Sequence, residues 1–321
     1  MRFRAPTIIR ESLTMTHIQR CQIIPLAAHQ VSFQIDDREV LRWNSGTDYP
    51  RPFFFPVVAP SGALLTRMGH PGAPDHDHHQ SIWFAHHKVT GIDFWGNASG
   101  AMIRQLQWLA YDDGEDACRM AVELGWFDGH DPAPLLRQEL ICEVRPLTET
   151  NEFTIEIQSR FLPISASLEF GQTNFGFLAV RVAKSISAVF GGGVLIGSEG
   201  TQTERNLFEK SARWMSYSGE TSRHYNRIEG ITYFDHPSNP GQPTGWHVRD
   251  DGWLCASPCM KTAITTTKEV PLTLRYLLHV HSGAVQQDRA DAIYAEFAAR
   301  KLLSVIKGTL PHTRWQVVRE S

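Results

Sequence analysis

Most of the chain alternates apolar and polar side chains with a period of two. Between residues 151 and 160, for example, Phe153, Ile155 and Ile157 alternate with polar residues. This alternation is typical of an antiparallel strand with one buried and one solvated face. Similar segments, several of them separated by turn-rich stretches, lie at 19–25, 30–43, 101–111, 117–126, 136–145, 178–189 and 271–281. The pattern predicts a mostly β protein.

One segment departs from this period and predicts a helix. Residues 288–306 are rich in alanine, place Ile293 and Phe297 four positions apart, and end before Gly308. The chain has no internal repeat and no linker-like change of composition. We therefore expect an all-β fold, a large antiparallel β-sandwich in one domain over residues 15–321, with this segment as its one substantial helix.

The N-terminal residues carry no recognisable targeting signal. Residues 1–14 contain arginines but neither the apolar stretch nor the cleavage site of a secretion signal, and we interpret them as a disordered extension, with Met15 as a candidate start. No window reaches the eighteen continuous apolar residues that a membrane helix requires. These features predict a soluble protein of the cytoplasm without a membrane partner.

Composition narrows the partners further. The 31 lysines and arginines and 34 aspartates and glutamates give a net charge of -3 without a basic stripe, which argues against nucleic acid. The five cysteines are odd in number and dispersed, as expected for free thiols in a reducing compartment. Histidine is the anomaly, because six of the fifteen lie between His70 and His87.

The densest group of titratable side chains lies in the window from residue 75 to residue 87. Imidazoles and carboxylates ligate metals or transfer protons at neutral pH, but alternate positions of an extended segment face opposite sides, so they cannot all serve one site. The H-E-x-x-H spacing of zinc peptidases is absent. We interpret the window as an active-site loop, and the alternative is a polar loop whose histidines only stabilise turns. Its candidate metal ligands are Asp75, His76 and His78, and its candidate acid–base residues are His79 and His86.

A second candidate loop spans residues 234–250 and contains three prolines and two glycines. Long structured loops often carry sites, although Asp235 could simply organise a turn here. In this loop His236 is a candidate acid or base. Trp246 beside His247 is the arrangement of a sugar platform with an adjacent acid or base, and we expect both loops to meet at one pocket.

Three further groups of polar residues could carry chemistry. Glu199, held between glycines, is either a general base with a pKa raised by burial or a solvated turn residue. Arg213 and Tyr217 would share a strand face and could hold hydroxyls or a carboxylate, with a surface pair as the alternative. His279 and His281 form a candidate metal pair, although exposed histidines are ordinary on strands.

Eight short blocks follow one another between residues 30 and 285, namely Tyr49–Pro56, Asp75–His79, Trp83–His86, Gly91–Trp95, Ser198–Gly200, Phe234–Pro240, Trp246–Arg249 and Leu274–Tyr276. Together they resemble the bacterial PmoA-like family, which takes its label from a component of membrane methane oxygenase. The resemblance implies a soluble all-β protein of carbohydrate-degrading bacteria. Methane oxidation is excluded, because the membrane component behind the label has many spans. The family pattern Asp-His-Pro-His-His-Arg-Gly departs here at Asp77 and at Gln80 and Ser81, so a role of that arginine does not carry over.

The predicted architecture also resembles the galactose mutarotase-like supersandwich, an analogy of fold that does not decide function. The leading hypothesis is a cytoplasmic enzyme that acts on a sugar or glycoside by acid–base catalysis, as an epimerase, lyase or hydrolase. Glu199 would exchange protons with His79 or His86. The remaining candidate substrate contacts are Trp83, Asp93 and Trp95.

Two other classes of function stay open at this point. One is an oxygenase or hydrolase that depends on a divalent metal such as iron or zinc, and the other is a non-catalytic carbohydrate-binding module. Binding alone does not need so many titratable groups in one loop, which favours catalysis. The substrate, the metal and the oligomeric state are not determined by the sequence.

Overall fold

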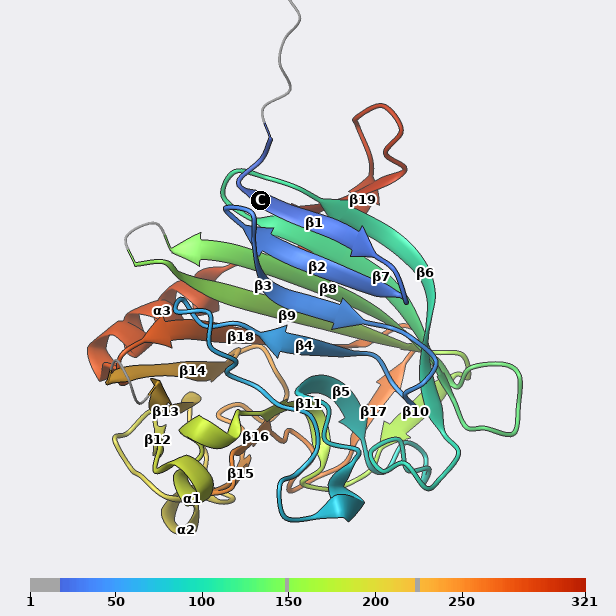
Figure 1. The fold of residues 1–321 in the computed structure, drawn as a ribbon. Coiled ribbons are helices and arrows are strands. Elements are labelled where there is room, and N and C mark those ends of the chain that lie inside the picture. The colour runs from blue at the N-terminus through green and yellow to red at the C-terminus, as the bar shows by residue number, and fades with distance from the viewer. Residues whose placement is uncertain (1–17, 148–149, 223–225) are drawn as a thin grey trace, which may run out of the picture.

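The computed structural model describes residues 18–147, 150–222 and 226–321, so the predicted N-terminal extension lies outside the described residues. Two eight-stranded antiparallel sheets make up most of the fold (Figure 1). Sheet 1 has the order β1-β2-β3-β4-β5-β11-β16-β15. Its strands are β1 (Cys21–Leu26), β2 (Gln30–Ile35), β3 (Arg38–Asn44), β4 (Phe53–Val57), β5 (Ile82–His86), β11 (Gly176–Arg181), β16 (Trp253–Ala256) and β15 (Trp246–Arg249).

Sheet 2 has the order β12-β13-β14-β18-β9-β8-β7-β6. Its strands are β12 (Val194–Gly197), β13 (Trp214–Ser222), β14 (Arg227–Asp235), β18 (Leu272–Ser282), β9 (Glu152–Pro163), β8 (Leu136–Leu147), β7 (Cys118–Phe127) and β6 (Met102–Asp112). Two further strand pairs join β10 (Ser167–Phe170) to β17 (Ile264–Thr267) and β19 (Leu303–Lys307) to β20 (Trp315–Arg319).

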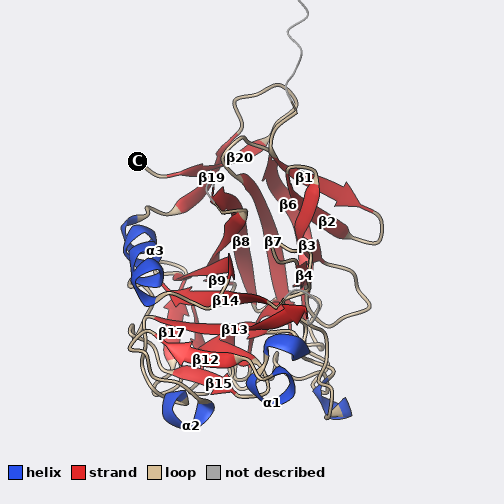
Figure 2. Ribbon diagram, turned by 60° about the vertical axis from the view of Figure 1, so that its left-hand side comes forward, coloured by secondary structure: helices blue, strands red, loops and turns tan. Residues whose placement is uncertain are grey.

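Helices are few and lie at the periphery of the strands (Figure 2). The longest in the described residues is α3 (Gln287–Ala299), and the others are α1 (Ala188–Gly191), α2 (Glu204–Leu207) and the 3-10 turns Pro74–His76 and Lys184–Ile186. This confirms the predicted all-β class with one substantial helix near the C-terminus. None of the helices in the described ranges is long and apolar enough to cross a membrane.

Three predicted element boundaries are wrong for identifiable reasons. The helix ends at Ala299 rather than at residue 306, because Leu303 and Val305 extend into β19 and pack against sheet 2. Residues 30–43 form two strands, since Asp36 and Asp37 adopt the left-handed turn that aspartate tolerates. The strand predicted at 178–189 stops at Arg181 and continues into short helical turns.

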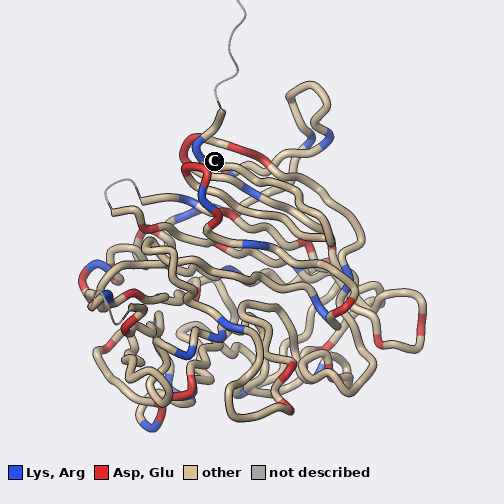
Figure 3. The backbone as a smooth tube through the Cα atoms, viewed as in Figure 1, with Lys and Arg blue, Asp and Glu red and all other residues tan. Residues whose placement is uncertain are grey.

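The main hydrophobic core fills the space between the two sheets. Phe84 of β5 and Tyr276 of β18, for example, face each other across it with ring centroids 6.1 Å apart. Acidic and basic positions are interspersed along the chain rather than gathered by sign (Figure 3). The outer face of sheet 2, predicted to be solvated, is instead covered by α3 and the β19–β20 hairpin.

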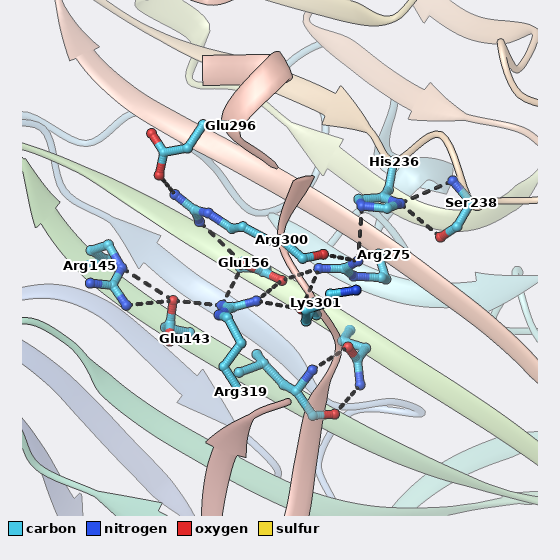
Figure 4. Close-up of polar contacts among 12 residues, drawn as sticks. Glu143, Arg145, Glu156, His236, Ser238, Arg275, Glu296, Arg300, Lys301 and Arg319 are labelled. Atoms are coloured by element: carbon cyan, nitrogen blue, oxygen red, sulfur yellow. Dashed lines mark hydrogen bonds and ion pairs between the residues drawn. The ribbon is translucent and has the colours of Figure 1, made fainter. Parts of the chain in front are cut away.

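A polar cluster on this covered face fastens the C-terminal hairpin (Figure 4). The carboxylate of Glu156, whose side chain is 1% exposed, accepts hydrogen bonds from Arg275, Arg300 and Arg319 at 3.0, 3.2 and 2.9 Å. Arg319 also donates to Glu143 at 3.0 Å. The polar face of β9 therefore serves as an anchor for the end of the chain.

Candidate functional site

The outer face of sheet 1, which points away from the sandwich core, carries a second aromatic cluster. Successive residues of a strand point to opposite faces, so Ile82 and Phe84 of β5 enter the core while Trp83 points outward. In β16, Trp253 points outward by the same alternation. Trp95, which follows a turn after β5, joins them. We call these three residues the tryptophan cluster.

The three indole rings of the tryptophan cluster pack against one another. Ring centroids lie 5.6 Å apart for Trp83 and Trp95, 5.4 Å for Trp83 and Trp253, and 5.5 Å for Trp95 and Trp253. Each residue is at most 4% exposed. Offset and edge-to-face contacts of this kind give a rigid apolar floor.

Strand register explains why Trp253 fits at the centre of this floor. Across four neighbouring strands, Trp83 pairs with Ala179, Ala179 with Cys255, and Cys255 with His247. The two middle residues are small, which leaves room above them. The ring of Trp253 reaches His79 at 5.0 Å and His247 at 5.7 Å, so both predicted loops contribute a histidine to one place.

A loop covers the tryptophan cluster and is closed at its base by backbone pairing. Met68 pairs with Gln80, and the amide of Gly69 donates to the carbonyl of His79 at 2.7 Å. The buried Arg51 donates to the carbonyls of His78 and Gly96, at 3.3 and 2.8 Å. We call residues 69–80 the covering loop.

Four imidazole rings gather in the covering loop. The centroids of His70, His76, His78 and His79 lie 4.4–6.5 Å apart in the pairs that touch. His76 bonds to the exposed Asp75 at 2.9 Å. Even so, no three His, Cys, Asp or Glu side chains among the described residues are arranged to hold a metal ion, and the predicted metal site gains no support from this geometry.

An ion pair between the buried Arg181 and the half-buried Asp251 borders the tryptophan cluster. Arg181, the last residue of β11, donates to both carboxylate oxygens of Asp251 at 2.7 and 2.9 Å, and its guanidinium lies 5.9 Å from the ring of Trp253. His70 bonds to the same carboxylate at 2.8 Å. Because the amide of Gly72 donates to Nδ1 of His70, Nε2 carries the proton that is given to Asp251.

Burial and neighbouring charge set the protonation of these groups. Burial, followed by the charge of Arg181, lowers the pKa of His79 far below its usual range, so its ring is neutral at pH 7. Burial lowers the pKa of His247 to about 4. Burial alone would raise the pKa of Asp251, but Arg181 and His70 hold it below its ordinary value.

Unpaired buried polar atoms concentrate in this region. Of eleven buried side-chain nitrogens and oxygens without a hydrogen-bond partner in the described residues, six belong to it: Arg67 Nη1, His79 Nδ1, Gln80 Oε1, Trp83 Nε1, Arg181 Nε and Trp253 Nε1. Buried indole N–H groups usually find a partner, and each one left unpaired costs free energy. Such a concentration is what a site for a polar ligand requires.

Two predicted site residues point into the sandwich core instead. His86 follows Phe84 on the inner face of β5, stacks on Phe177 at 4.7 Å and bonds through Nε2 to the carbonyl of Gly171 at 2.9 Å. Trp246 is likewise in the core, and its indole donates to the carbonyl of Ala212. Its neighbour His247 faces outward, because adjacent strand residues cannot share a face.

Another group of predicted residues lies on or beneath sheet 2. The Glu199 side chain is 73% exposed and pairs with Arg213 at 3.4 Å, and none of its hydrogen bonds or ion pairs within the described chain goes to a histidine. Arg213 also meets Asp291 of α3 at 3.2 Å, whereas Tyr217 turns into the core and donates to a backbone carbonyl. Arg213 and Tyr217 therefore do not share a face.

Three predicted histidines lie on the covered face of sheet 2. His236 accepts from Arg275 at 2.9 Å and packs on Phe297 of α3, so the second loop divides between the two sheets. His279 and His281 are buried rather than exposed, and His279 bonds to Glu152 at 2.8 Å. These two histidines are buried because the α3 segment packs over them. The alternation of β18 alone does not reveal this cover.

Asp93 shapes the turn that delivers Trp95, because its carboxylate accepts from the amides of Trp95 and Gly96 at 2.7 and 3.0 Å. Four residues around the tryptophan cluster were not predicted from the sequence, namely Arg67, Arg181, Asp251 and Trp253. A usable signal was present at Arg181, since an arginine that ends the apolar run from Gly176 has to find a partner.

Comparisons with known proteins give one family match. The model of a family of unknown function, DUF6807, matches residues 30–295. No curated protein matches the chain. The PmoA-like resemblance therefore stays a prediction.

Two solved structures show distant likeness to the chain. One is a candidate mutarotase, YeaD, from Salmonella typhimurium, at 13% identity over 82% of this chain and 97% of that one, with a TM-score of 0.28. The other is a TPR-domain containing protein from Parabacteroides distasonis, at 8% identity over 89% of this chain and 51% of that one, also with a TM-score of 0.28. These scores are too low to support an argument about fold or function.

Proposed function

Because the chain belongs to DUF6807, a family of unknown function, we propose its function from its own geometry: an enzyme that binds a sugar on the tryptophan cluster and transfers a proton through His79. The observation that carries this proposal is the group of unpaired buried N–H donors among indoles that pack at tilted and edge-to-face angles. Indole faces pack against the C–H surface of a sugar ring, and N–H groups at their edges donate to its hydroxyls.

His79 is the acid–base residue that this arrangement favours. Its Nδ1 has no partner, its ring touches Trp253, and its lowered pKa keeps the ring in the neutral form of a base. Because the same burial makes the enclosed ring a weak base, proton transfer requires the covering loop to open and relieve that burial. Hydrolysis of a glycoside commonly needs a pair of carboxylates. Asp251 is not free to act as one of them, because Arg181 and His70 bind both of its oxygens. Removal of a proton, as in epimerisation or elimination, therefore fits this site better than hydrolysis by paired carboxylates.

The tryptophan cluster is almost unexposed, and His79 of the covering loop packs on the rings of Trp83 and Trp253, so this loop has to move for a sugar to reach those two rings. Most of the loop's own residues are exposed or half-buried, so opening it breaks few apolar contacts. The floor beneath it belongs to paired strands and stays in place. This division between a movable cover and a fixed floor is common in enzymes that exclude water.

A proton-exchange experiment tests this proposal. The protein is incubated in D₂O with a panel of aldoses, sugar acids and glycosides, and loss of sugar C–H signals or new products is followed by ¹H NMR. His79→Gln should reduce the rate by about a hundredfold to ten-thousandfold, as expected for removal of a positioned base. The exposed His312 supplies a matched control, and His312→Gln should exchange at the wild-type rate.

The alternative assignment gives the opposite result. If His79→Gln is as active as the wild type while Glu199→Gln or His86→Ala is inactive and folded, the chemistry does not occur on the outer face of sheet 1. Circular dichroism and thermal unfolding of each variant separate loss of activity from loss of fold.

A further inference from the structure

Four of the six unpaired atoms beside the tryptophan cluster can only donate. They are nitrogens of Arg67, Trp83, Arg181 and Trp253, whereas Nδ1 of the neutral His79 donates or accepts according to its tautomer and the side-chain oxygen of Gln80 accepts. Arginine and tryptophan nitrogens cannot accept hydrogen bonds. A ligand that satisfies this set has to offer acceptors in excess, whereas each hydroxyl of a neutral sugar is both a donor and an acceptor.

Direct ion pairing at the same place is incomplete. Arg181 is paired with Asp251, whereas the guanidinium of the half-buried Arg67 donates, within the described residues, to the backbone carbonyls of Val182 and Asp251, at 3.0 and 2.7 Å. The buried Arg51 donates to two backbone carbonyls and to Asn97. Neither Arg51 nor Arg67 forms a salt bridge in the described chain, and the carboxylates that act on them, Asp77 and Asp93 for Arg51 and Asp251 for Arg67, do so without direct contact. An anionic ligand would add a direct ion pair at this place.

Arg181, which lies beside the ring of Trp253, and Arg67, which lies over the ring of Phe190, occupy adjoining positions. The amide of Arg67 donates to the carbonyl of Arg181 at 3.1 Å, and both side chains contact Asp251. Burial, followed by the charge of Arg181, lowers the pKa of Arg67 to about 10, as expected for two cations that approach each other closely. The guanidinium of Arg181 lies beside the ring of Trp253, so an anion held there would be next to the proposed sugar floor.

From this juxtaposition we infer that the ligand is a sugar acid, whose carboxylate binds Arg67 and Arg181 while its ring lies on the tryptophan cluster. The inference rests on the proposed function and adds the substrate class to it. A carboxylate can accept from both unpaired nitrogens, Nη1 of Arg67 and Nε of Arg181, through its two oxygens.

Matched pairs of sugars test the inference in the full-length protein. Binding of glucuronate and glucose, and of galacturonate and galactose, is measured by isothermal titration calorimetry at 50 mM NaCl. Each acid should bind about tenfold more tightly than its neutral partner, the effect of a charge-assisted hydrogen bond. Arg67→Gln should remove this preference by weakening the binding of each acid to the level of its neutral partner. The exposed Arg137 provides a control with the same change of charge, and Arg137→Gln should keep the preference.

The outcomes separate the inference from the proposed function. If acids and neutral sugars bind equally, or Arg67→Gln keeps the preference, the carboxylate site is refuted while the sugar site stands. If no sugar binds, both are refuted. If acetate alone competes fully with glucuronate and neutral sugars do not bind, the site is an anion site without a sugar subsite. Should Arg67→Gln not fold, the wild type still decides, because the preference for acids has to shrink between 50 and 500 mM NaCl.

Discussion

Trp246 and Trp253 lie in neighbouring strands of sheet 1 and point to opposite faces. Their indole N–H groups differ in hydrogen bonding. The Trp246 N–H donates to the carbonyl of Ala212 at 2.9 Å inside the core. The Trp253 N–H is buried and has no partner in the described residues. The first group contributes to folding, whereas the second costs free energy until a ligand accepts its hydrogen bond.

This contrast gives a prediction that needs no substrate. Trp246→Phe and Trp253→Phe remove the same volume, but only the first leaves a backbone carbonyl without its donor. We expect Trp246→Phe to lower the free energy of unfolding by about 1–3 kcal/mol more than Trp253→Phe. Urea unfolding followed by circular dichroism measures both values. Equal losses would indicate that the Trp253 indole is structural and would weaken the proposed sugar site.

At the scale of elements, β9 and the C-terminal hairpin are joined by charge as well as by packing. Glu156 of β9 receives three arginines, one each from β18, the residue after α3 and β20. Removing one member of a buried ionic group leaves its partners uncompensated, which costs much more than the loss of an exposed ion pair. The end of the chain should therefore depend more on this carboxylate than on Glu143, which binds only Arg319 of the three.

We predict that Glu156→Gln lowers the free energy of unfolding by about 3 kcal/mol. The matched control is Glu296→Gln, because Glu296 also pairs with Arg300, at 2.6 Å, but is 67% exposed. That variant should lose no more than about 0.5 kcal/mol. Limited proteolysis should also cut Glu156→Gln earlier within the β19–β20 hairpin. Similar stabilities of the two variants would contradict the anchoring role.

The elements were more predictable from the sequence than the site. Alternation located most strands, and the alanine-rich segment located α3. Alternation also places Trp246 and His247 on opposite faces of sheet 1. Because other parts of the chain cover both faces of the sheet, alternation does not tell which of the two residues points into the core. The covering loop and α3 bury the outer faces of the two sheets, so a buried outer position such as Trp253 has the same signature as a core position.

For the whole molecule, the buried histidines determine how stability depends on pH. Burial lowers the pKa to about 4 at His86, His236, His247 and His281. In the unfolded chain these groups titrate near 6.5, so between about pH 6.5 and pH 4 the unfolded state binds more protons. Stability therefore falls as the pH falls through this window.

Two carboxylates modify this dependence without reversing it. Burial raises the pKa of Asp235 to about 6, so its proton stabilises the fold as the pH falls and offsets about as much stability as one of these histidines loses. Glu152, with a pKa of about 2, contributes a loss only below about pH 4.5. Four histidines outweigh one aspartate.

We predict a loss on the order of several kcal/mol between pH 7 and pH 4.5. The free energy of unfolding in urea at pH 7.5, 6.5, 5.5 and 4.5 measures it. A flat profile down to pH 5 would contradict this prediction and would mean that these histidines are solvated in the folded state.

The closed base of the covering loop also bears on how this protein can diversify. Because Met68, Gln80, Gly69 and His79 fix the two ends of the loop by backbone pairing, the exposed residues between them can change without altering the strands below. Relatives that keep the tryptophan cluster and vary residues 71–78 of this loop would share one fold yet accept different ligands. Within such a family, exchanging residues 71–78 would transfer ligand preference from one member to another.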